Sequence, residues 1–201
     1  MRVAALDHGH RGRARVAVWL MGKVIGHSPD VLKTFVYRPN FFGRHASRAL
    51  QQIMGGPSPW SVTDRELFAA YTSRLNQCPF CTGQHGAAAS AGLGKDIIEA
   101  AYADRTTAPV SAEVKAALAL IETFTLRPDE LGPDDVETAR TAGLSDEAIE
   151  HVFNVATMFN LINRLADAFE FNLPDQERLD QDAKVVLRFG YRFPQFLFPR
   201  P

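Results

Sequence analysis

Both cysteines of this 201-residue chain lie in one stretch, Asn76-Gln77-Cys78-Pro79-Phe80-Cys81-Thr82-Gly83-Gln84-His85. They stand three positions apart, and His85 follows four positions after Cys81. At this spacing in a helix the two thiols can approach across one turn, and the histidine lies on the same face. A nucleophilic thiol with a base on the next turn is the minimal apparatus of thiol catalysis, so the stretch predicts redox chemistry.

The order of residues in the stretch places the thiols at the start of a helix. Proline is preferred at the first helical position, so we expect Cys78 at the N-cap and Pro79 directly after it. The unpaired N–H groups and the positive dipole end of the helix then face the thiols. Thiols in such a setting have pKa values lowered to roughly 3.5–7.5, which predicts a reactive thiolate. His85 lies close enough to Cys81 to exchange a proton with it.

Two other interpretations of these residues stay open. Buried cysteines can serve only as small apolar side chains in a core. Cys78, Cys81 and His85 can also bind a metal ion such as zinc, with Glu66 as a fourth ligand. Structural zinc sites usually draw ligands from two separated segments, and the sequence shows no second cluster of cysteines and histidines. The redox interpretation is therefore preferred.

Signals for helix starts and stops recur along almost the whole chain. Ser28-Pro29-Asp30 is typical of a helix start, and Thr63 with Glu66 three positions later matches a capping box. Ser145 is expected to cap the longest helix. No segment alternates like a strand, which predicts an all-α fold. The expected helices are an amphipathic one around residues 16–23 and others at about 28–37, 40–54, 63–75, 78–92, 95–103, 111–126, from 133, and 145–171.

The breaks between these helices are too short to be domain linkers. We expect one domain with three parts: an N-terminal helical arm (1–57) packed on a core (58–175) that carries the Cys-x-x-Cys helix, and a C-terminal helix with an aromatic tail (176–201). The tail has five aromatic residues between positions 189 and 198 without a regular period. It is typical of a strap that lies on another surface, of the same chain or of a neighbour.

The composition is that of an intracellular enzyme. Lys plus Arg (22) nearly equals Asp plus Glu (23), so no basic excess indicates a nucleic-acid partner. The apolar run after Arg11, Arg13 and Arg15 is interrupted by Lys23 and lacks a convincing cleavage site, so we interpret it as a helix rather than a secretory signal. No run approaches the roughly 20 apolar residues of a membrane span. These features predict a cytoplasmic protein without a membrane partner.

Several motifs resemble those of a known family. The pattern is Glu66, then Cys-x-x-Cys twelve positions later, then a histidine four positions after the second cysteine. Gly56-Pro57-Ser58-Pro59 and Asp64-Arg65-Glu66-Leu67 accompany it, as do Gly26-His27-Ser28-Pro29 and Asn163-Arg164-Leu165-Ala166-Asp167. Together they resemble, over roughly residues 20–175, the alkylhydroperoxidase D-like (AhpD-like) proteins of the carboxymuconolactone decarboxylase superfamily, in their peroxidase-related branch.

This resemblance implies an all-α, AhpD-like helical bundle that forms a homo-oligomer (dimer, trimer or hexamer). It implies a thiol-dependent peroxidase whose only redox group is a Cys78–Cys81 disulfide, with no other cofactor and no metal. Cys81 is then the peroxidatic thiol, Cys78 resolves it, and His85 and Glu66 form a proton relay. The partners are a peroxide or other small molecule and a dithiol reductant protein. Phe80 departs from members that carry a histidine before the second cysteine, so a weak peroxidase or a disulfide reductase stays open.

Other functions within the superfamily also remain possible. They include a lactone decarboxylase, whose activity does not depend on a cysteine pair, and a non-enzymatic oligomer. Two further polar features are left outside the catalytic set. One is a stripe at helical spacing, which could form a wall near the thiols or a structural hydrogen-bond network: Asn160, Asn163, Arg164 and Asp167. The other is the pair His27 and His45, for which packing or capping is expected.

Overall fold

The computed structural model describes residues 1–191, and these residues form helices and no strand. The all-α prediction is therefore confirmed over the described part of the chain. The helices are α1 (Ala4–His8), α2 (Gly12–Ile25), α3 (Asp30–Tyr37), the π-helix η1 (Pro39–Gly43), α4 (Arg44–Gly55), α5 (Val62–Leu75), α6 (Pro79–Leu93), α7 (Lys95–Ala103), α8 (Ala112–Leu126), α9 (Pro133–Thr141), α10 (Asp146–Phe169) and α11 (Gln176–Phe189).

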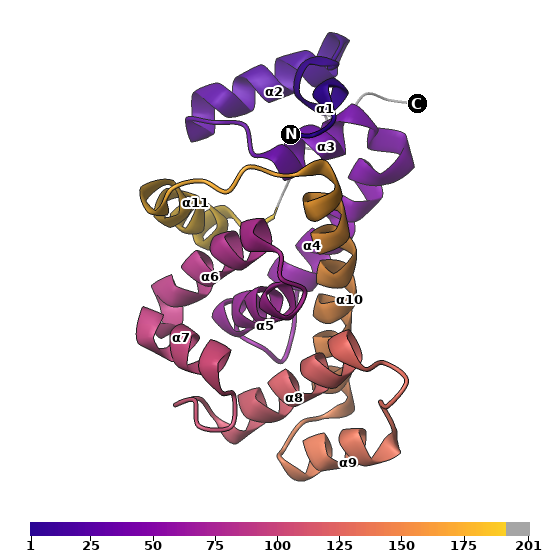
Figure 1. The fold of residues 1–201 in the computed structure, drawn as a ribbon, viewed down its shortest axis with the longest axis vertical. Helices are drawn as coiled ribbons and strands as arrows, with labels where there is room; N and C mark the ends of the chain where they lie inside the picture. Colours follow the sequence, from indigo (N-terminus) through magenta and orange to yellow (C-terminus); the bar gives the residue numbers. More distant parts are fainter. Residues whose placement is uncertain (192–201) are drawn as a thin grey trace.

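Helix α5 is the centre of the molecule. It packs against α4, α6, α7, α8 and α10, which surround it in Figure 1. Nine consecutive residues of α5, from position 65 to 73, are buried. A helix that is buried on every side has no solvent-exposed polar face. The polar side chains of α5 therefore lie in the interior together with its apolar ones. Two of those polar side chains, Glu66 and Ser73, belong to the surroundings of the thiols.

The N-terminal helices α1–α3 gather at one end of the molecule, above α11 and the top of α10 in Figure 1. Phe35 and Val36 of α3 join the same apolar core as α5 and α10. Asp30 also accepts hydrogen bonds from the backbone and side chain of Asn172, at 2.9 and 2.8 Å. The helices of the predicted arm are thus tied to the segment that follows α10. The three-part division of the chain stays a prediction.

Two predicted helix starts are wrong. Ser28 does not cap α3, because its hydroxyl donates to the carbonyl of Val18 instead, at 2.7 Å. The capping box of α5 is formed by Ser61 and Asp64 rather than by Thr63 and Glu66. The helix begins one residue earlier than expected, which places Glu66 a full turn inside it. Ser145 caps α10 as predicted, accepting from the N–H of Ala148 at 3.1 Å.

The expected helix at 40–54 begins as the π-helix η1 before it continues as α4. Gly43 ends η1 against the backbone of Phe35, where an added Cβ would overlap the carbonyl of that residue. This close approach brings α3 and α4 together at one side of the cavity described below. Among the helices of residues 1–191, none is long and apolar enough to cross a membrane.

Candidate active site

The turn between α5 and α6 fixes the position of Cys78. Gln77 has a left-handed backbone (φ 56°), and its N–H donates to Arg74 while the N–H of Cys78 donates to Ser73, both at 3.0 Å. This pair of bonds is the Schellman arrangement that ends many helices. Cys78 is at the same time the N-cap of α6, with Pro79 at the first helical position as predicted. One residue therefore ends one helix and starts the next.

Both thiols lie in the interior. Cys78 is fully buried and Cys81 is 1 % exposed, and neither forms a disulfide in this structure. Cys78 makes no capping hydrogen bond with its side chain. The thiols instead contact each other, and the amide of Asn163 on α10 contacts Cys81.

The surroundings correct the predicted acidity of Cys81. The hydrogen bond with Cys78, together with burial, raises the pKa of the Cys81 thiol well above its usual range. The hydrogen bond from Asn163 acts in the opposite direction, but it does not outweigh the other two effects. The helix N-terminus was expected to lower this pKa. The expectation is wrong because it left out the hydrogen bond between the two thiols and the burial of Cys81.

The polar stripe of α10 is divided between interior and surface. Asn163 is fully buried and donates to Ser73 at 3.0 Å, and Asn76 donates to Asn160 and Asn163 at 2.9 and 3.0 Å. These bonds hold the α5–α6 turn onto α10, directly before Cys78. Arg164 and Asp167 are exposed. Of the four residues, only Asn163 therefore forms part of the wall around the thiols.

Glu66 and His85 form a buried pair. The Nδ1 atom of His85 lies 2.7 Å from Oε2 of Glu66, a carboxylate that is itself fully buried. A carboxylate only accepts hydrogen bonds, so Nδ1 carries the proton and Nε2 of the neutral ring is the free acceptor. Phe159 packs edge-on against the imidazole, with ring centroids 4.4 Å apart. His85 is therefore held in one orientation, one helical turn after Cys81.

Tyr191 completes this pair and was not predicted from the sequence. Its hydroxyl donates to Oε1 of Glu66 at 2.7 Å and lies 3.2 Å from Nδ1 of His85. Its ring stacks on the imidazole at an interplanar angle of 25°. Burial and the negative charge of Glu66 raise the pKa of Tyr191 well above its usual range, so the hydroxyl stays a donor. The tail was expected to form a strap, but its remaining residues, 192–201, lie outside the described part of the chain.

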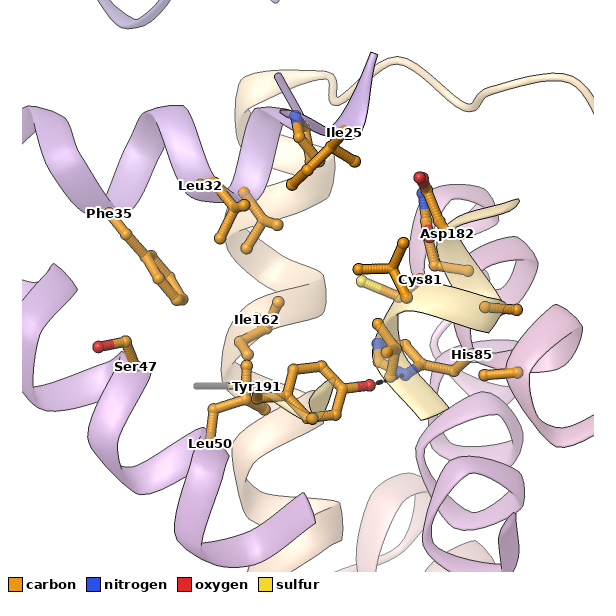
Figure 2. Close-up of a pocket in the computed structure, with 18 of the residues that line it drawn as sticks. Ile25, Leu32, Phe35, Ser47, Leu50, Cys81, His85, Ile162, Asp182 and Tyr191 are labelled. Atoms are coloured by element: carbon orange, nitrogen blue, oxygen red, sulfur yellow. Dashed lines mark hydrogen bonds between the residues drawn. The ribbon is translucent and has the colours of Figure 1, made fainter. Parts of the chain in front are cut away.

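A cavity of about 450 Å³ opens beside Cys81 and His85. Figure 2 shows Cys81 and His85 on one side, Leu32 and Phe35 on the other, and Tyr191 between them beside Leu50. Most of the lining is carbon, contributed by α2, α3, α4, α6, α10 and α11. Phe80 also lines it and packs edge-on against Phe171. A volume of this size fits a small organic molecule.

The rim of the cavity carries a second polar group. Asp182 of α11 accepts from His27 at 2.8 Å and from Gln84 at 3.2 Å, and it is 7 % exposed. These bonds join the loop after α2, α6 and α11 around the opening. His27 thus makes a polar bond rather than the packing or capping contact expected for it, and His45 is exposed on α4.

The four predicted site residues thus meet at one place. Within residues 1–191, no group of three or more His, Cys, Asp and Glu side chains is arranged to hold a metal ion. The sequence analysis missed Tyr191 and left Asn163 undecided. The aromatic tail was a signal for the first residue, but nothing local to Tyr191 indicates that it reaches Glu66, 125 positions earlier.

Several solved structures share this architecture. A peroxidase-related protein from Silicibacter sp. TM1040 is 26 % identical, with a TM-score of 0.72 over 84 % of this chain and 87 % of its own. A peroxidase-related protein from Ralstonia eutropha JMP134, described as an alkylhydroperoxidase AhpD core, is 22 % identical, with a TM-score of 0.74 over 88 % and 93 %. The debrominase Bmp8 is 16 % identical, with a TM-score of 0.68 over 85 % and 91 %. No curated protein matches the chain.

The fold and the site define an all-helical protein with a buried dithiol beside a glutamate–histidine pair. Residues 42–123 match the Carboxymuconolactone decarboxylase family. Together with the shared fold, this match confirms the resemblance to the AhpD-like proteins of the carboxymuconolactone decarboxylase superfamily that the sequence predicted. This superfamily includes enzymes. The matched segment contains Glu66, Cys78, Cys81 and His85, whereas Tyr191 lies outside it.

Proposed function

We propose that the protein is a thiol-dependent peroxidase that reduces an organic hydroperoxide with the dithiol Cys78–Cys81. The observation that carries the proposal is that Cys81 and His85 line the same apolar cavity, with Glu66 buried directly behind the histidine. The cavity offers room for an organic body, the dithiol supplies two electrons, and the histidine handles the protons.

Cys81 is assigned as the attacking thiol. It lines the cavity, whereas Cys78 is fully buried and is absent from the described lining. The raised pKa of Cys81 keeps it protonated at neutral pH, so attack requires a base. His85 lies at i+4 on the same helix, with its free Nε2 available to take the thiol proton. Helix-end electrostatics alone would have favoured Cys78, but access and proton transfer outweigh it here.

The reaction balances with two protons and two electrons. The Cys81 thiolate attacks the terminal oxygen of the hydroperoxide, so an S–O bond forms and the O–O bond breaks. The leaving alkoxide takes a proton from the His85 imidazolium and departs as the alcohol. Cys78 then attacks the sulfenic acid on Cys81, an S–S bond forms, and water leaves. A dithiol slender enough to enter the cavity reaches Cys81 and returns the pair to the reduced state by thiol–disulfide exchange.

Single-cysteine variants test the assignment. Cys81→Ser is expected to abolish hydroperoxide consumption. Cys78→Ser is expected to retain one fast turnover and to accumulate a sulfenic acid on Cys81 that a dimedone-type reagent traps. A trapped sulfenic acid on Cys78 in the Cys81→Ser protein would reverse the two roles. Absence of peroxide consumption by the wild type would exclude the peroxidase.

A second candidate is reductive dehalogenation of an aromatic compound. It is favoured by the carbon-rich cavity and by the fold shared with the debrominase Bmp8, of which a cysteine-to-alanine variant was solved with 2,3,4-tribromopyrrole. The same dithiol balances this reaction: the aryl carbon gains hydrogen, bromide leaves, and the two thiols become a disulfide. Release of bromide from 2,3,4-tribromopyrrole, without consumption of cumene hydroperoxide, would favour this candidate over the peroxidase.

A lactone decarboxylase and a protein disulfide reductase fit the site less well. The decarboxylase must bind carboxylates, and the described lining of the cavity contains Asp182 but no lysine or arginine. The disulfide reductase needs a thiol that a folded substrate can touch, whereas both thiols here are at most 1 % exposed. A small apolar substrate meets neither obstacle.

A further inference from the structure

We propose that Tyr191 is a positioning residue for the Glu66–His85 pair, contributed from outside the segment that carries the family match. The inference rests on the proposed function for its catalytic meaning. The contact itself is a property of the folded chain, however, and can be tested without substrate.

Glu66 needs two donors because it is a fully buried carboxylate. A buried anion without hydrogen-bond partners is strongly disfavoured. His85 supplies one donor to Oε2 and Tyr191 supplies the other to Oε1, both at 2.7 Å. Among the described residues, these two give Glu66 its side-chain hydrogen bonds. Tyr191 therefore completes the hydrogen bonding of the carboxylate and keeps it aimed at the imidazole.

The phenol has only one proton, which fixes the direction of the network. While the hydroxyl donates to Glu66, it cannot donate to Nδ1 of His85, 3.2 Å away. Nδ1 must then keep its own proton, and Nε2 stays free for the thiol. Tyr191 thus stabilises the tautomer that the proposed reaction needs.

The fold delivers Tyr191 by a sharp turn after α11. This helix packs along α6, which carries His85. It ends at Gly190, whose φ of 65° is a backbone conformation that glycine adopts without strain. The chain therefore reverses towards the cavity, where the hydroxyl of Tyr191 points at His85, as seen in Figure 2.

Removing only the hydroxyl separates a positioning role from packing. Tyr191→Phe keeps the ring but leaves Oε1 of Glu66 without its donor. A less stabilised carboxylate holds the proton of its partner more tightly, so His85 becomes protonated at higher pH. The loss of the phenol oxygen acts in the opposite direction, but its contact with Nδ1 is longer and uncharged, so the effect on the carboxylate outweighs it.

The experiment is an NMR titration of the His85 ring in the reduced protein, with the resonance assigned through His85→Gln. Tyr191→Phe is expected to move the titration midpoint upwards by about one pH unit. The acid limb of peroxide turnover should move by the same amount. Tyr71→Phe is the matched control, because it removes a tyrosine–glutamate bond to Glu122, away from the cavity. It should leave both curves unchanged.

The two proposals fail in different ways. An unchanged His85 midpoint in Tyr191→Phe, even with a uniform loss of rate or a lower melting temperature, would reduce Tyr191 to packing and overturn the inference. A shifted midpoint in a protein that consumes no hydroperoxide would instead leave the role of Tyr191 standing and remove the peroxidase.

Discussion

At the scale of single residues, the site depends on one buried negative charge. Glu66 sits inside a helix that is buried on every side, and its two oxygens are bonded to His85 and Tyr191. The corrected capping box frees Glu66 from any role at the helix start, since Ser61 and Asp64 fill it. Among residues 1–191, the side-chain hydrogen bonds that compensate for its burial come from His85 and Tyr191.

Glu66→Gln tests whether the charge matters. The amide keeps the shape and one acceptor, but its NH₂ group faces a donor and the imidazolium loses its counter-charge. Peroxide turnover is expected to fall by roughly 10²-fold or more, the usual size of a lost acid–base function. Unfolding in urea should show a loss of about 1–3 kcal/mol, as for a mismatched buried hydrogen bond. Turnover equal to that of the wild type would show that Glu66 has no part in catalysis.

The raised pKa of Cys81 predicts how stability depends on pH. In the unfolded chain a cysteine loses its proton near pH 8.5, whereas the folded protein holds that of Cys81 to higher pH. The stabilisation is complete below the unfolded pKa and is lost as the pH rises towards the folded one. Under reducing conditions, the wild type should therefore lose more stability between about pH 8 and 10 than Cys81→Ser. Parallel curves for the two proteins would contradict the burial of this thiol.

At the scale of helices, the sequence predicts the elements better than their first residues. The starts of α6 and α10 were predicted correctly from Pro79 and Ser145, because both residues affect only the backbone of the first helical turn. Ser28 and Thr63 misled because serine and threonine also bond to distant carbonyls or to neighbouring hydroxyls, as both do here. The left-handed Gln77 could not be foreseen either, because glutamine has no special preference for that conformation.

The start of α5 allows a direct comparison of the two capping assignments. Ser61→Ala removes the hydroxyl that accepts from the N–H of Asp64 and should lower the free energy of unfolding by about 1 kcal/mol. Thr63→Ala removes a contact to that hydroxyl and the methyl that lies against Gly92, but no capping hydrogen bond, and should cost clearly less. Both are measured by chemical denaturation. A larger loss for Thr63→Ala would restore the cap predicted from the sequence.

The residues of the candidate site that lie close together in the sequence could be predicted from it. Cys78, Cys81 and His85 share one helix start, and the spacing of Glu66 fits the family pattern. Tyr191 and Asn163 reach the site only through the packing of α11 on α6 and of α10 on α5. The hydrogen bond between the two thiols and the burial of Cys81 also depend on the folded structure, so the direction of the pKa shift of Cys81 was predicted wrongly.

At the scale of the whole molecule, apolar side chains of α2 are exposed among the described residues 1–191. Val16, Trp19 and Leu20 lie on one face of α2 and are exposed, Trp19 by 60 %. Such a face on a short helix is typical of a contact with another subunit. We expect a closed homo-oligomer, as the resemblance implied.

Light scattering tests this expectation. The mass should be a multiple of 22.2 kDa at micromolar concentration, and Trp19→Ser should shift the distribution towards smaller species because it removes the largest exposed ring of that face. A wild-type mass of a single chain under these conditions would contradict the homo-oligomer.

The central claim is that one dithiol consumes one hydroperoxide, and counting thiols tests it most directly. The reduced protein, unfolded after quenching because both thiols are buried, should titrate two thiols per chain. After one equivalent of cumene hydroperoxide it should titrate none, with one equivalent of alcohol released, and dithiothreitol should restore both thiols. Two thiols still titrating after the peroxide, or a loss that dithiothreitol does not reverse, would contradict the account.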